Sequence, residues 1–306
     1  MEVRRGRDRK LERVICFDTA ELNSKLSFPF LLNLIVIEYL DESVVENLVK
    51  TGNSDDSVAN EAVLTALRED KDVVSGIIEG GFTVWQGTRH LLNFLDSNDA
   101  EDGHFIKGKR VLDLGCGAGL LGLYALEKGA SCVVFQDYNE LILRAWTISN
   151  VSIATGVSRT ESVSFYSGDW HDLSRLWRTL PDLRFDLILT AETIYRPELY
   201  TKLHEVLDVA LARNPDSSII MANKLSYYGI GGNIYDFVKF VEERGAFSLS
   251  MKQLTDSGIT YVCLSMKRIL SKYSTLISRI AANATLSKST VKIGLELLPH
   301  FVLGRT

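Results

Sequence analysis

Residues 110–266 alternate between short apolar runs and longer segments whose apolar residues recur at helical spacing. A short apolar run bounded by glycine or polar residues predicts a buried strand, and a longer amphipathic segment predicts a helix. Gly129 follows one such segment and Pro197 opens another, as expected at helix ends and starts. The predicted strands are residues 110–116, 133–136, 162–166, 185–190, 217–222, 247–253 and 260–266, and the predicted helices are residues 120–128, 140–154, 197–211 and 234–244.

Strands that alternate with helices form a parallel sheet with helices on both faces. The last two predicted strands are separated only by a turn at residues 256–258, so they must pair antiparallel. The sequence therefore predicts an α/β fold, a Rossmann-like doubly wound sheet of seven strands, mostly parallel, with an antiparallel C-terminal hairpin. This domain is expected over residues 76–269. The flanks are predicted to be an irregular, partly disordered N-terminal extension (residues 1–75, with a linker at 51–60) and a C-terminal tail of unknown structure (residues 270–306).

The most apolar segment, residues 26–40, follows a basic start and invites comparison with a membrane anchor or signal peptide. It is too short to cross a bilayer, which takes about 20 apolar residues. It also contains Pro29, Asn33 and Glu38. We expect this segment to pack onto the domain and expect no membrane association.

Net charge and residue usage argue against several kinds of binding site. The net charge of −5 argues against a broad phosphate-binding surface, so no direct contact with nucleic acid is expected. The chain has four cysteines and five histidines, without a CxxC pair or regular spacing. This usage is typical of reduced thiols in the cytoplasm or nucleus, and it predicts neither a disulfide framework nor a metal site.

A glycine-rich loop directly after the first predicted strand, VLDLGCGAGLLG at residues 111–122, predicts a nucleotide-like cofactor. Gly115, Gly117 and Gly119 let the backbone turn sharply and approach a ligand closely. The spacing also satisfies GxGxxG, so a nicotinamide-dinucleotide oxidoreductase is an alternative, although that pattern alone is weak evidence. Asp113 favours S-adenosylmethionine, because a carboxylate at this strand end can meet the cationic methionine ammonium. A helix or turn cap is the other interpretation of Asp113.

Acidic residues also follow the next two predicted strands. Asp137 stands where both nucleotide-binding classes place an acid that accepts hydrogen bonds from the ribose hydroxyls. Gly168, Asp169 and Trp170 follow the third strand. There the carboxylate can accept the adenine amino hydrogens and the indole can pack on the purine, unless Trp170 only fills the core.

Residues 76–269 resemble the histidine protein methyltransferase 1 family of the seven-strand class. The matching blocks are EGGFTVWQ at residues 79–86, the glycine loop at 111–122, FQDYN at 135–139, SGDW at 167–170, LTAETIY at 189–195 and YYGIGG at 227–232. The glycine loop is shared by many methyltransferases, whereas the other blocks together are more selective. Two positions depart from the family, which usually has glutamate at Gln86 and often has serine at Ala191.

The resemblance implies S-adenosylmethionine as cofactor and places Glu192 and Tyr195 at the acceptor. These two residues form an acidic-x-x-aromatic motif after the fourth strand. The alternatives are that Glu192 is the N-cap or a first-turn acid of the following helix and that Tyr195 only packs. The cofactor site that it implies comprises Val84, Trp85, Gln86, Gly87, Thr88, Gly115, Gln136, Asp137, Tyr138, Gly168, Asp169, Trp170 and Ala191.

The activity implied is methyl transfer to a histidine ring nitrogen, the tele nitrogen, in a protein, with large-subunit ribosomal protein three as the suggested substrate. Imidazole has a pKa near 6.5 and is largely neutral at pH 7, so the acceptor needs the correct tautomer more than deprotonation. Glu192 or Tyr195 is expected to hold that tautomer. Lysine methylation and a non-catalytic cofactor-binding role in ribosome assembly remain alternatives. We expect a monomer located in cytoplasm and nucleus.

Overall fold

The structure, a computed structural model, describes the whole of the predicted sheet and parts of the N-terminal region. The predicted C-terminal tail, residues 270–306, lies outside the described residues, as do residues 51–57 of the predicted linker. The described residues are 2–5, 11–13, 30–31, 36–37, 39–41, 45, 58–69, 71, 73–102, 105–155, 162–255 and 257–269.

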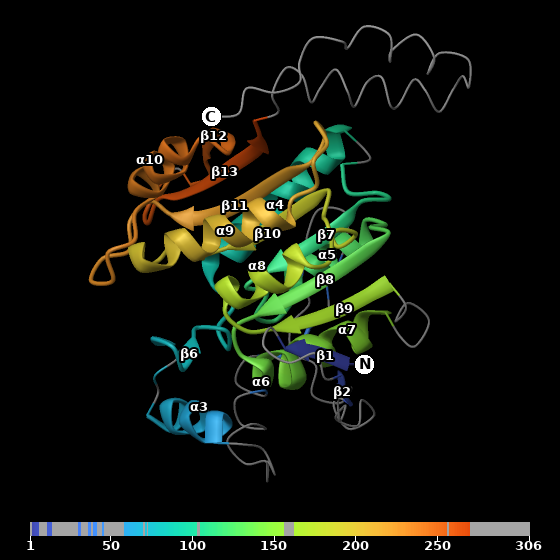
Figure 1. The fold of residues 1–306 in the computed structure, drawn as a ribbon, viewed down its shortest axis with the longest axis vertical. Helices are drawn as coiled ribbons and strands as arrows, with labels where there is room; N and C mark the ends of the chain where they lie inside the picture. The colour runs from blue at the N-terminus through green and yellow to red at the C-terminus, as the bar shows by residue number, and fades with distance from the viewer. Residues whose placement is uncertain are drawn as a thin grey trace, which may run out of the picture.

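Seven strands form the predicted doubly wound sheet (Figure 1). They are β7 (Arg110–Leu114), β8 (Cys132–Asp137), β9 (Val163–Ser167), β10 (Leu187–Ala191), β11 (Ser218–Lys224), β12 (Phe247–Gln253) and β13 (Tyr261–Arg268). Their order is β12-β13-β11-β10-β7-β8-β9. The five strands β7 to β11 pair in parallel, whereas β13 is antiparallel to both β11 and β12. The predicted fold class is confirmed.

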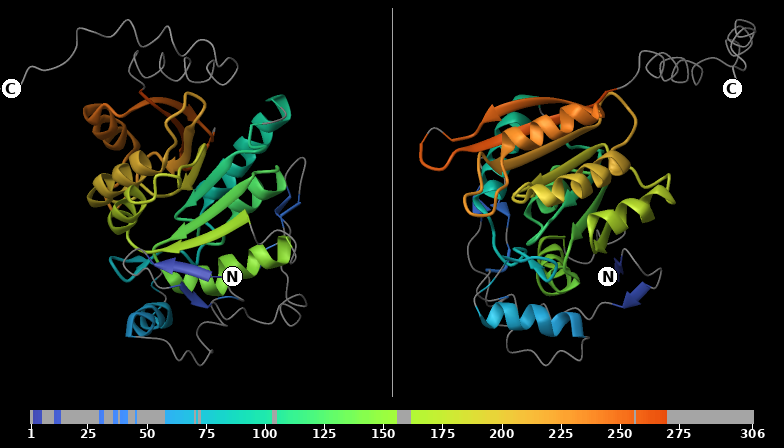
Figure 2. Two further views of the ribbon diagram at one scale, coloured as in Figure 1. Left: turned by 45° about the vertical axis from the view of Figure 1, so that its right-hand side comes forward. Right: turned by 60° about the vertical axis from the view of Figure 1, so that its left-hand side comes forward.

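Helices cover both faces of this sheet (Figures 1 and 2). They are α4 (Gln86–Asp102), α5 (Leu120–Glu127), α6 (Glu140–Ile142), η2 (Leu143–Thr147), α7 (Ile148–Thr155), α8 (Trp170–Arg178), η4 (Pro197–Leu199), α9 (Tyr200–Ala210) and α10 (Ile234–Arg244). Helices α4 and α5 contact one face, and α8, α9 and α10 form the layer on the other. The sequence analysis did not predict α4 and α8.

The core divides into two layers because successive side chains of a strand point to opposite faces. In β7, Val111 packs with the helices α4 and α5, while Leu112 packs in the layer of α8 to α10. Val133 and Val134 of β8 divide in the same way. Burial on both faces explains why these strands are continuous apolar runs without alternation.

The predicted helix at residues 140–154 contains a π-helical turn, η2. This turn lies beside the glycine-rich loop, and the Thr147 hydroxyl donates to the Gly117 carbonyl at 2.6 Å. π-Turns within helices are frequent near functional sites, because the extra residue re-aims one side chain. Here the contact fixes the backbone of the loop.

The N-terminal region contributes short elements that the sequence analysis did not predict. They are β1 (Glu2–Arg5), β2 (Leu11–Arg13), β3 (Phe30–Leu31), β4 (Val36–Ile37), α3 (Val58–Arg68), β5 (Val73–Val74) and β6 (Ile78–Glu79). β1 pairs parallel to β9 and β2 pairs antiparallel to β1, which extends the main sheet to nine strands. Part of the predicted irregular extension is therefore strand, because the edge of β9 offers unpaired backbone groups.

The apolar segment at residues 26–40 packs onto the domain at its described end. Leu40 is fully buried, its N–H donates to Asn150 Oδ1 at 2.8 Å, and its carbonyl accepts from Trp146 Nε1 at 2.8 Å. β3 and β4 pair antiparallel within the same segment. Among the described residues, we find no helix with the length and hydropathy needed to cross a membrane.

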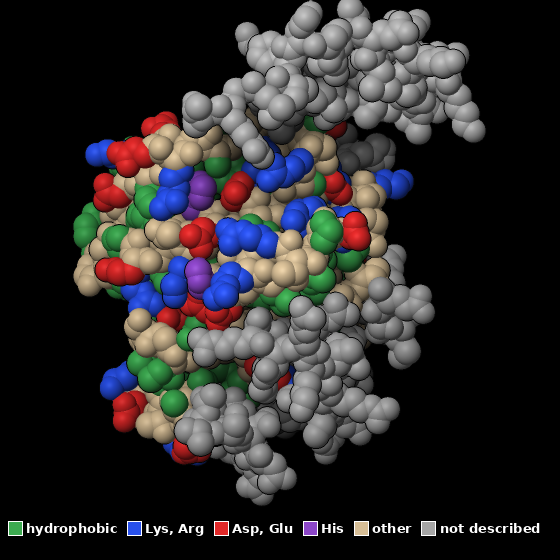
Figure 3. Space-filling view, in the orientation of Figure 1, with side chains coloured by type: hydrophobic (Ala, Val, Ile, Leu, Met, Phe, Trp, Pro, Cys, Tyr) green, Lys and Arg blue, Asp and Glu red, His purple; other side chains and the backbone are tan. Residues whose placement is uncertain are grey.

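The face that carries α8 and α9 mixes charges of both signs (Figure 3). Lys202 of α9 forms an ion pair with Asp169, the N-cap of α8, and His171 Nδ1 of α8 lies 3.2 Å from Glu205 Oε2 of α9. Basic groups on this face are therefore partly neutralised by acidic neighbours.

Candidate functional site

A cavity of about 550 Å³ opens at the carboxyl ends of the parallel strands. Ligands of doubly wound folds bind at this edge, where the loops that follow the strands converge. Its walls are the loops after β7, β8, β9 and β10, the segment at residues 75–88, the start of the helical stretch at residues 198–202, and Ile230. The predicted site residues that line it are Val84, Trp85, Thr88, Gly115, Gly117, Asp137, Tyr138, Asp169, Trp170, Ala191, Glu192 and Tyr195.

The glycine-rich loop lies against the segment that contains Gly81. Gly115 and Gly117 line the cavity with positive φ angles of 67° and 50°. A Cβ on Gly117 would lie 3.1 Å from the Gly81 carbonyl oxygen, so a side chain there would be crowded as well as strained. Gly119 does not line the cavity and instead begins α5, with a φ of 80°.

Asp113 does not line the cavity. Its side chain is buried, and Oδ2 accepts from the Gly122 N–H in the first turn of α5 at 2.8 Å. Burial raises the pKa of Asp113 to about 8, against the opposing effect of that hydrogen bond. Asp113 therefore has the capping role that was the alternative interpretation, and its contact with the methionine ammonium, direct or through water, stays a prediction.

Asp137 is at the position predicted for ribose recognition. It lines the cavity at the end of β8, and its carboxylate accepts from the N–H groups of Gly117 at 2.9 Å and Asn139 at 3.1 Å. Burial raises its pKa to about 6, although these backbone donors oppose the increase. A carboxylate that is already held by the glycine-rich loop is a preorganised acceptor for a diol.

Gln136 and Gly168 support the cavity from behind and do not line it. Gln136 is fully buried, and its Nε2 donates to the Gly168 carbonyl at 3.0 Å. Its Oε1 accepts from Trp170 Nε1 at 3.0 Å and from the Gly115 N–H at 3.3 Å. One amide therefore links the loops after β7, β8 and β9, and it holds the Trp170 indole in the cavity wall.

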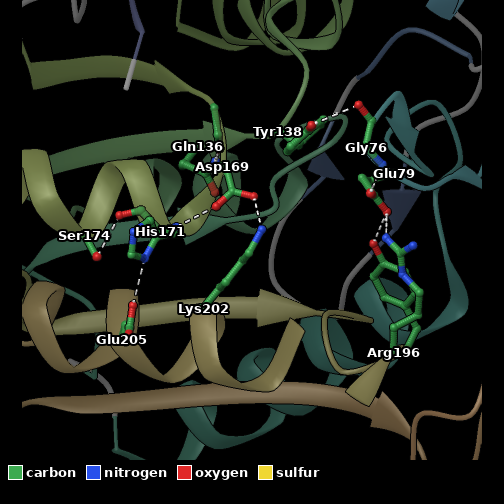
Figure 4. Close-up of polar contacts among 12 residues, drawn as sticks. Gly76, Glu79, Gln136, Tyr138, Asp169, His171, Ser174, Arg196, Lys202 and Glu205 are labelled. Atoms are coloured by element: carbon green, nitrogen blue, oxygen red, sulfur yellow. Dashed lines mark hydrogen bonds and ion pairs between the residues drawn. The ribbon is translucent and has the colours of Figure 1, made fainter. Parts of the chain in front are cut away.

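Asp169 and Lys202 form an ion pair of 2.7 Å within the cavity wall (Figure 4). Asp169 is also the N-cap of α8, where its Oδ1 accepts from the His171 N–H at 2.8 Å. Its carboxylate thus already has two partners. Lys202 was not among the predicted site residues, because its partner is 33 residues away in the sequence.

The segment at residues 84–88 contributes Val84, Trp85 and Thr88 to the wall, but Gln86 and Gly87 do not line it. Gln86 begins α4 and its side chain is exposed. Gly87 has a different role, because its N–H donates to Glu192 Oε1 at 3.1 Å. A Cβ on Gly87 would lie 2.8 Å from Glu192 Cγ, so only glycine leaves room for that carboxylate.

Glu192 has the only positive φ angle, 58°, found for a non-glycine residue among the described residues. Its side chain is 8% exposed and lines the cavity. Oε2 accepts from the Tyr227 hydroxyl at 2.5 Å, and the Tyr261 hydroxyl is hydrogen-bonded to the same carboxylate. Burial raises the pKa of Tyr227, and the charge of Glu192 is the second-largest cause of the increase. This phenol therefore keeps its proton and stays a donor. The helix that follows begins with Arg196 as N-cap, so Glu192 is not its cap.

Tyr195 lines the cavity, as Glu192 does, and is hydrogen-bonded to Glu79 on the opposite wall. Glu79 and its neighbours Arg196, Gly76 and Tyr138 are labelled in Figure 4. The Tyr195 hydroxyl donates to Glu79 Oε2 at 2.5 Å, and Arg196 forms an ion pair with the same oxygen. The Gly76 N–H donates to Glu79 Oε1 at 2.9 Å, and the Tyr138 hydroxyl donates to the Gly76 carbonyl at 3.0 Å. These contacts fasten the segment at residues 75–85 over the cavity.

A second, smaller pocket of about 70 Å³ shares part of this wall. The residues common to both are Glu79, Trp85, Glu192, Tyr195 and Ile230. Val73, Lys224 and Tyr227 complete the smaller pocket, which we call the acceptor pocket. The Lys224 ammonium lies 5.3 Å from the ring centre of Trp85 and 5.6 Å from that of Tyr227. Glu192 is therefore placed where the two spaces meet.

The residues that the sequence analysis missed as site residues are Glu79, Arg196, Lys202, Lys224, Tyr227 and Tyr261. Glu79 and Tyr227 belong to blocks that matched the family, so the resemblance carried a signal for them. The other four residues reach the site only through tertiary contacts, for which the sequence carried no signal. Across the described part of the chain, no group of three or more His, Cys, Asp or Glu residues could hold a metal ion.

Comparison with known proteins identifies the family. A family model described as lysine methyltransferase matches residues 63–235. A histidine protein methyltransferase 1 homolog from Rattus norvegicus is 33% identical over 258 residues, which cover 76% of this chain and 69% of that protein. The homolog from Bos taurus is 34% identical over 218 residues, covering 64% of this chain and 57% of that protein. A protein N-lysine methyltransferase from Danio rerio is 28% identical over 144 residues, 47% of this chain and 61% of that protein.

Solved structures support the fold. The structure of a proposed S-adenosylmethionine-dependent methyltransferase from Streptococcus mutans matches with a TM-score of 0.50 at 15% identity, covering 79% of this chain and 56% of that chain. The chain spans 57% and 69% of the length of the Bos taurus and Rattus norvegicus relatives.

The cavity fits S-adenosylmethionine, the cofactor of this family. Gly117 allows close approach of a ligand, Asp137 can accept two hydroxyls, and Trp170 offers an aromatic face. The volume of about 550 Å³ lies within the range of cofactor sites. With its fold, site and relatives in agreement, the chain belongs to the histidine protein methyltransferase 1 family of S-adenosylmethionine-dependent methyltransferases.

Proposed function

We propose that the protein is a protein-histidine N-methyltransferase, which transfers a methyl group from S-adenosylmethionine to a ring nitrogen of a histidine in another protein. The observation that carries this proposal is the Glu192 carboxylate. It is buried, held in a strained backbone conformation and placed between the cofactor cavity and the acceptor pocket. Strain of this kind persists at functional sites when the surrounding contacts over-determine it.

The chain must align an acceptor lone pair with the methyl carbon, because bound S-adenosylmethionine supplies an already activated methyl group. In an in-line displacement the nitrogen–carbon bond forms as the sulfur–carbon bond breaks. Glu192 keeps accepting capacity after binding Gly87, Tyr227 and Tyr261, since its two carboxylate oxygens have two lone pairs each. It can therefore hold the N–H of a neutral imidazole and direct the other nitrogen toward the cofactor cavity. The same carboxylate balances the positive charge that the imidazole ring gains.

The Lys224 ammonium favours a neutral acceptor over a cationic one. It lies over the faces of Trp85 and Tyr227, where an incoming lysine ammonium would find its own cation–π contacts. At about 4 Å, two like charges repel by about 1 kcal/mol in water and by about 4 kcal/mol near a protein surface. Imidazole avoids this repulsion because most of it is neutral at pH 7.

Protein-lysine methylation is the second candidate, because the matching family model is described as lysine methyltransferase. The finer assignment, the tele nitrogen of a histidine in large-subunit ribosomal protein three, rests on the family resemblance. A monomeric enzyme in cytoplasm and nucleus also stays a prediction, and its location rests on the cysteine usage. The names of the relatives support a protein substrate.

Labelled cofactor tests this proposal. The full chain is incubated with methyl-labelled S-adenosylmethionine and cell extract, and the labelled proteins are hydrolysed for amino-acid analysis. We expect label in methylhistidine, and separation of the two ring isomers assigns the nitrogen. Label in methyllysine would replace the proposal with the second candidate. Binding of the cofactor without any labelled protein would indicate a non-catalytic role.

A further inference from the structure

The loop between β11 and α10 presents large apolar side chains to solvent at the edge of the acceptor pocket. Tyr228 is 94% exposed and Ile230 is 46% exposed. Ile230 also lines both the cofactor cavity and the acceptor pocket, so the exposed surface continues directly into the site. In Figure 1 this connection projects beyond the ends of the strands. We call residues 227–233 the mouth loop.

The mouth loop is held rigidly by its own backbone and by the loop after β10. The Tyr227 N–H donates to the Gly232 carbonyl at 2.8 Å, and the Gly231 N–H donates to the Tyr227 carbonyl at 2.9 Å. The Gly232 N–H donates to the Tyr195 carbonyl at 2.9 Å, and a Cβ on Gly232 would lie 2.1 Å from the Ile194 carbonyl oxygen. An aromatic residue on such a loop loses little conformational entropy when a partner covers it.

The mouth loop carries no charge. Residues 225–235 contain no acidic or basic side chain, and the nearest charged residues along the chain are Lys224 and Asp236. A partner therefore gains most here by burying uncharged side chains, which avoids the cost of desolvating ions. Tyrosine is among the residue types that most often dominate the binding energy of an interface once a partner covers them.

We propose that the mouth loop docks the protein substrate by binding an uncharged, apolar stretch next to the acceptor residue, with Tyr228 and Ile230 as its main contacts. This inference rests on the proposed function, because the occupant is the segment that carries the methylated side chain. Ile230 bridges the docked stretch and the acceptor pocket, so the contact positions the acceptor as well as binding it. The surface does not contact the cofactor through Tyr228, which does not line the cavity.

Dependence of the methylation rate on substrate concentration tests this docking role. Initial rates of label transfer to protein are measured over a dilution series of cell extract, for the unchanged chain and for Tyr228→Ala, Tyr228→Phe and Ile230→Ala. The control is Leu180→Ala, because Leu180 is 37% exposed and follows α8, which runs away from the cavity edge. Calorimetric binding of S-adenosylmethionine confirms that each variant is folded.

We expect Tyr228→Ala to raise the half-saturating extract concentration about tenfold, with the plateau rate and cofactor affinity unchanged. Tyr228→Phe should behave like the unchanged chain, since the ring is kept, and so should Leu180→Ala. An unshifted concentration dependence for Tyr228→Ala would overturn the docking role, and so would a lower plateau without a shift. Failure of the unchanged chain to label any protein would instead overturn the proposed function.

Discussion

Glu192 combines three features at the scale of one residue: a left-handed backbone, a buried carboxylate and neutral donors on both oxygens. The donors are the Gly87 N–H and the hydroxyls of Tyr227 and Tyr261. None of them carries a charge that would cancel that of Glu192. The carboxylate is thus held in position and can still accept a hydrogen bond from an N–H group of the substrate.

Replacing Glu192 by glutamine tests whether its charge acts in the transfer step. We expect Glu192→Gln to lower kcat about 100-fold, because the amide cannot balance the charge on the acceptor ring. The affinity for S-adenosylmethionine should change less than about threefold, since the amide oxygen can still accept from Gly87. Single-turnover rates and calorimetry measure the two quantities. Full activity in this variant would remove Glu192 from the mechanism.

Lys224→Met tests the discrimination between neutral and cationic acceptors. Methionine fills a similar volume without the ammonium, so the repulsion of a cationic side chain disappears. We expect the ratio of methyllysine to methylhistidine formed in extract to rise about tenfold or more. Leu180→Ala serves as the unchanged reference. A constant ratio would show that Lys224 does not determine the acceptor class.

We expect Asp137 to make the affinity for S-adenosylmethionine depend on pH. Hydrogen bonds from ribose hydroxyls favour the ionised carboxylate, whose pKa is about 6 in the unliganded protein. Affinity for S-adenosylmethionine should therefore fall as pH decreases through 6 and be nearly constant above pH 7. Calorimetry between pH 5 and 8 measures this, and Asp137→Asn should weaken binding and flatten the curve. A pH-independent affinity in the unchanged chain would contradict the role.

At the scale of the element, α5 can pack closely against β8 because Gly122 has no side chain. A Cβ there would lie 2.2 Å from Phe135 Cε1 and 2.7 Å from Cζ. We expect Gly122→Ala to lower the free energy of unfolding by about 1–3 kcal/mol, as overpacked cores do, despite the better helix propensity of alanine. Urea denaturation measures the change. Glu127→Ala, at an exposed position of the same helix, should leave the midpoint nearly unchanged.

Helices and strands with a clear local pattern could be predicted from the sequence. Features that depend on contacts between residues far apart in the sequence could not. β7, β12 and α10 match the predicted ranges within two residues, because apolar runs and helical spacing are local signals. α8 was missed, since its start at Trp170 was interpreted as a cofactor contact or as a core residue and not as the beginning of a helix. Within the site, Asp137 follows from its place after a strand. The bond between Gly87 and Glu192 joins residues 105 positions apart and leaves no local trace.

At the scale of the whole molecule, Asp113 makes stability decrease with rising pH. Its folded pKa of about 8 lies above the ordinary value of 3.8, so the folded state holds a proton that the unfolded state has released. The stability is fully present below about pH 4 and is lost as pH rises through 8. We expect Asp113→Asn to reduce this loss between pH 5 and 8 by about 1–3 kcal/mol. Urea unfolding at both pH values measures it, and an identical slope in both proteins would contradict the assignment.

The wall shared by the cofactor cavity and the acceptor pocket, with Trp85, Tyr195 and Glu79 on both sides, has a consequence for the order of events. Two ligands that touch one wall are energetically coupled, and such coupling is reciprocal. If filling one space draws the wall into place for the other, each ligand raises the affinity for its neighbour by the same factor. Demethylated cofactor and modified protein would then raise each other's affinity by one common factor. Release of the first product would therefore limit the rate of turnover.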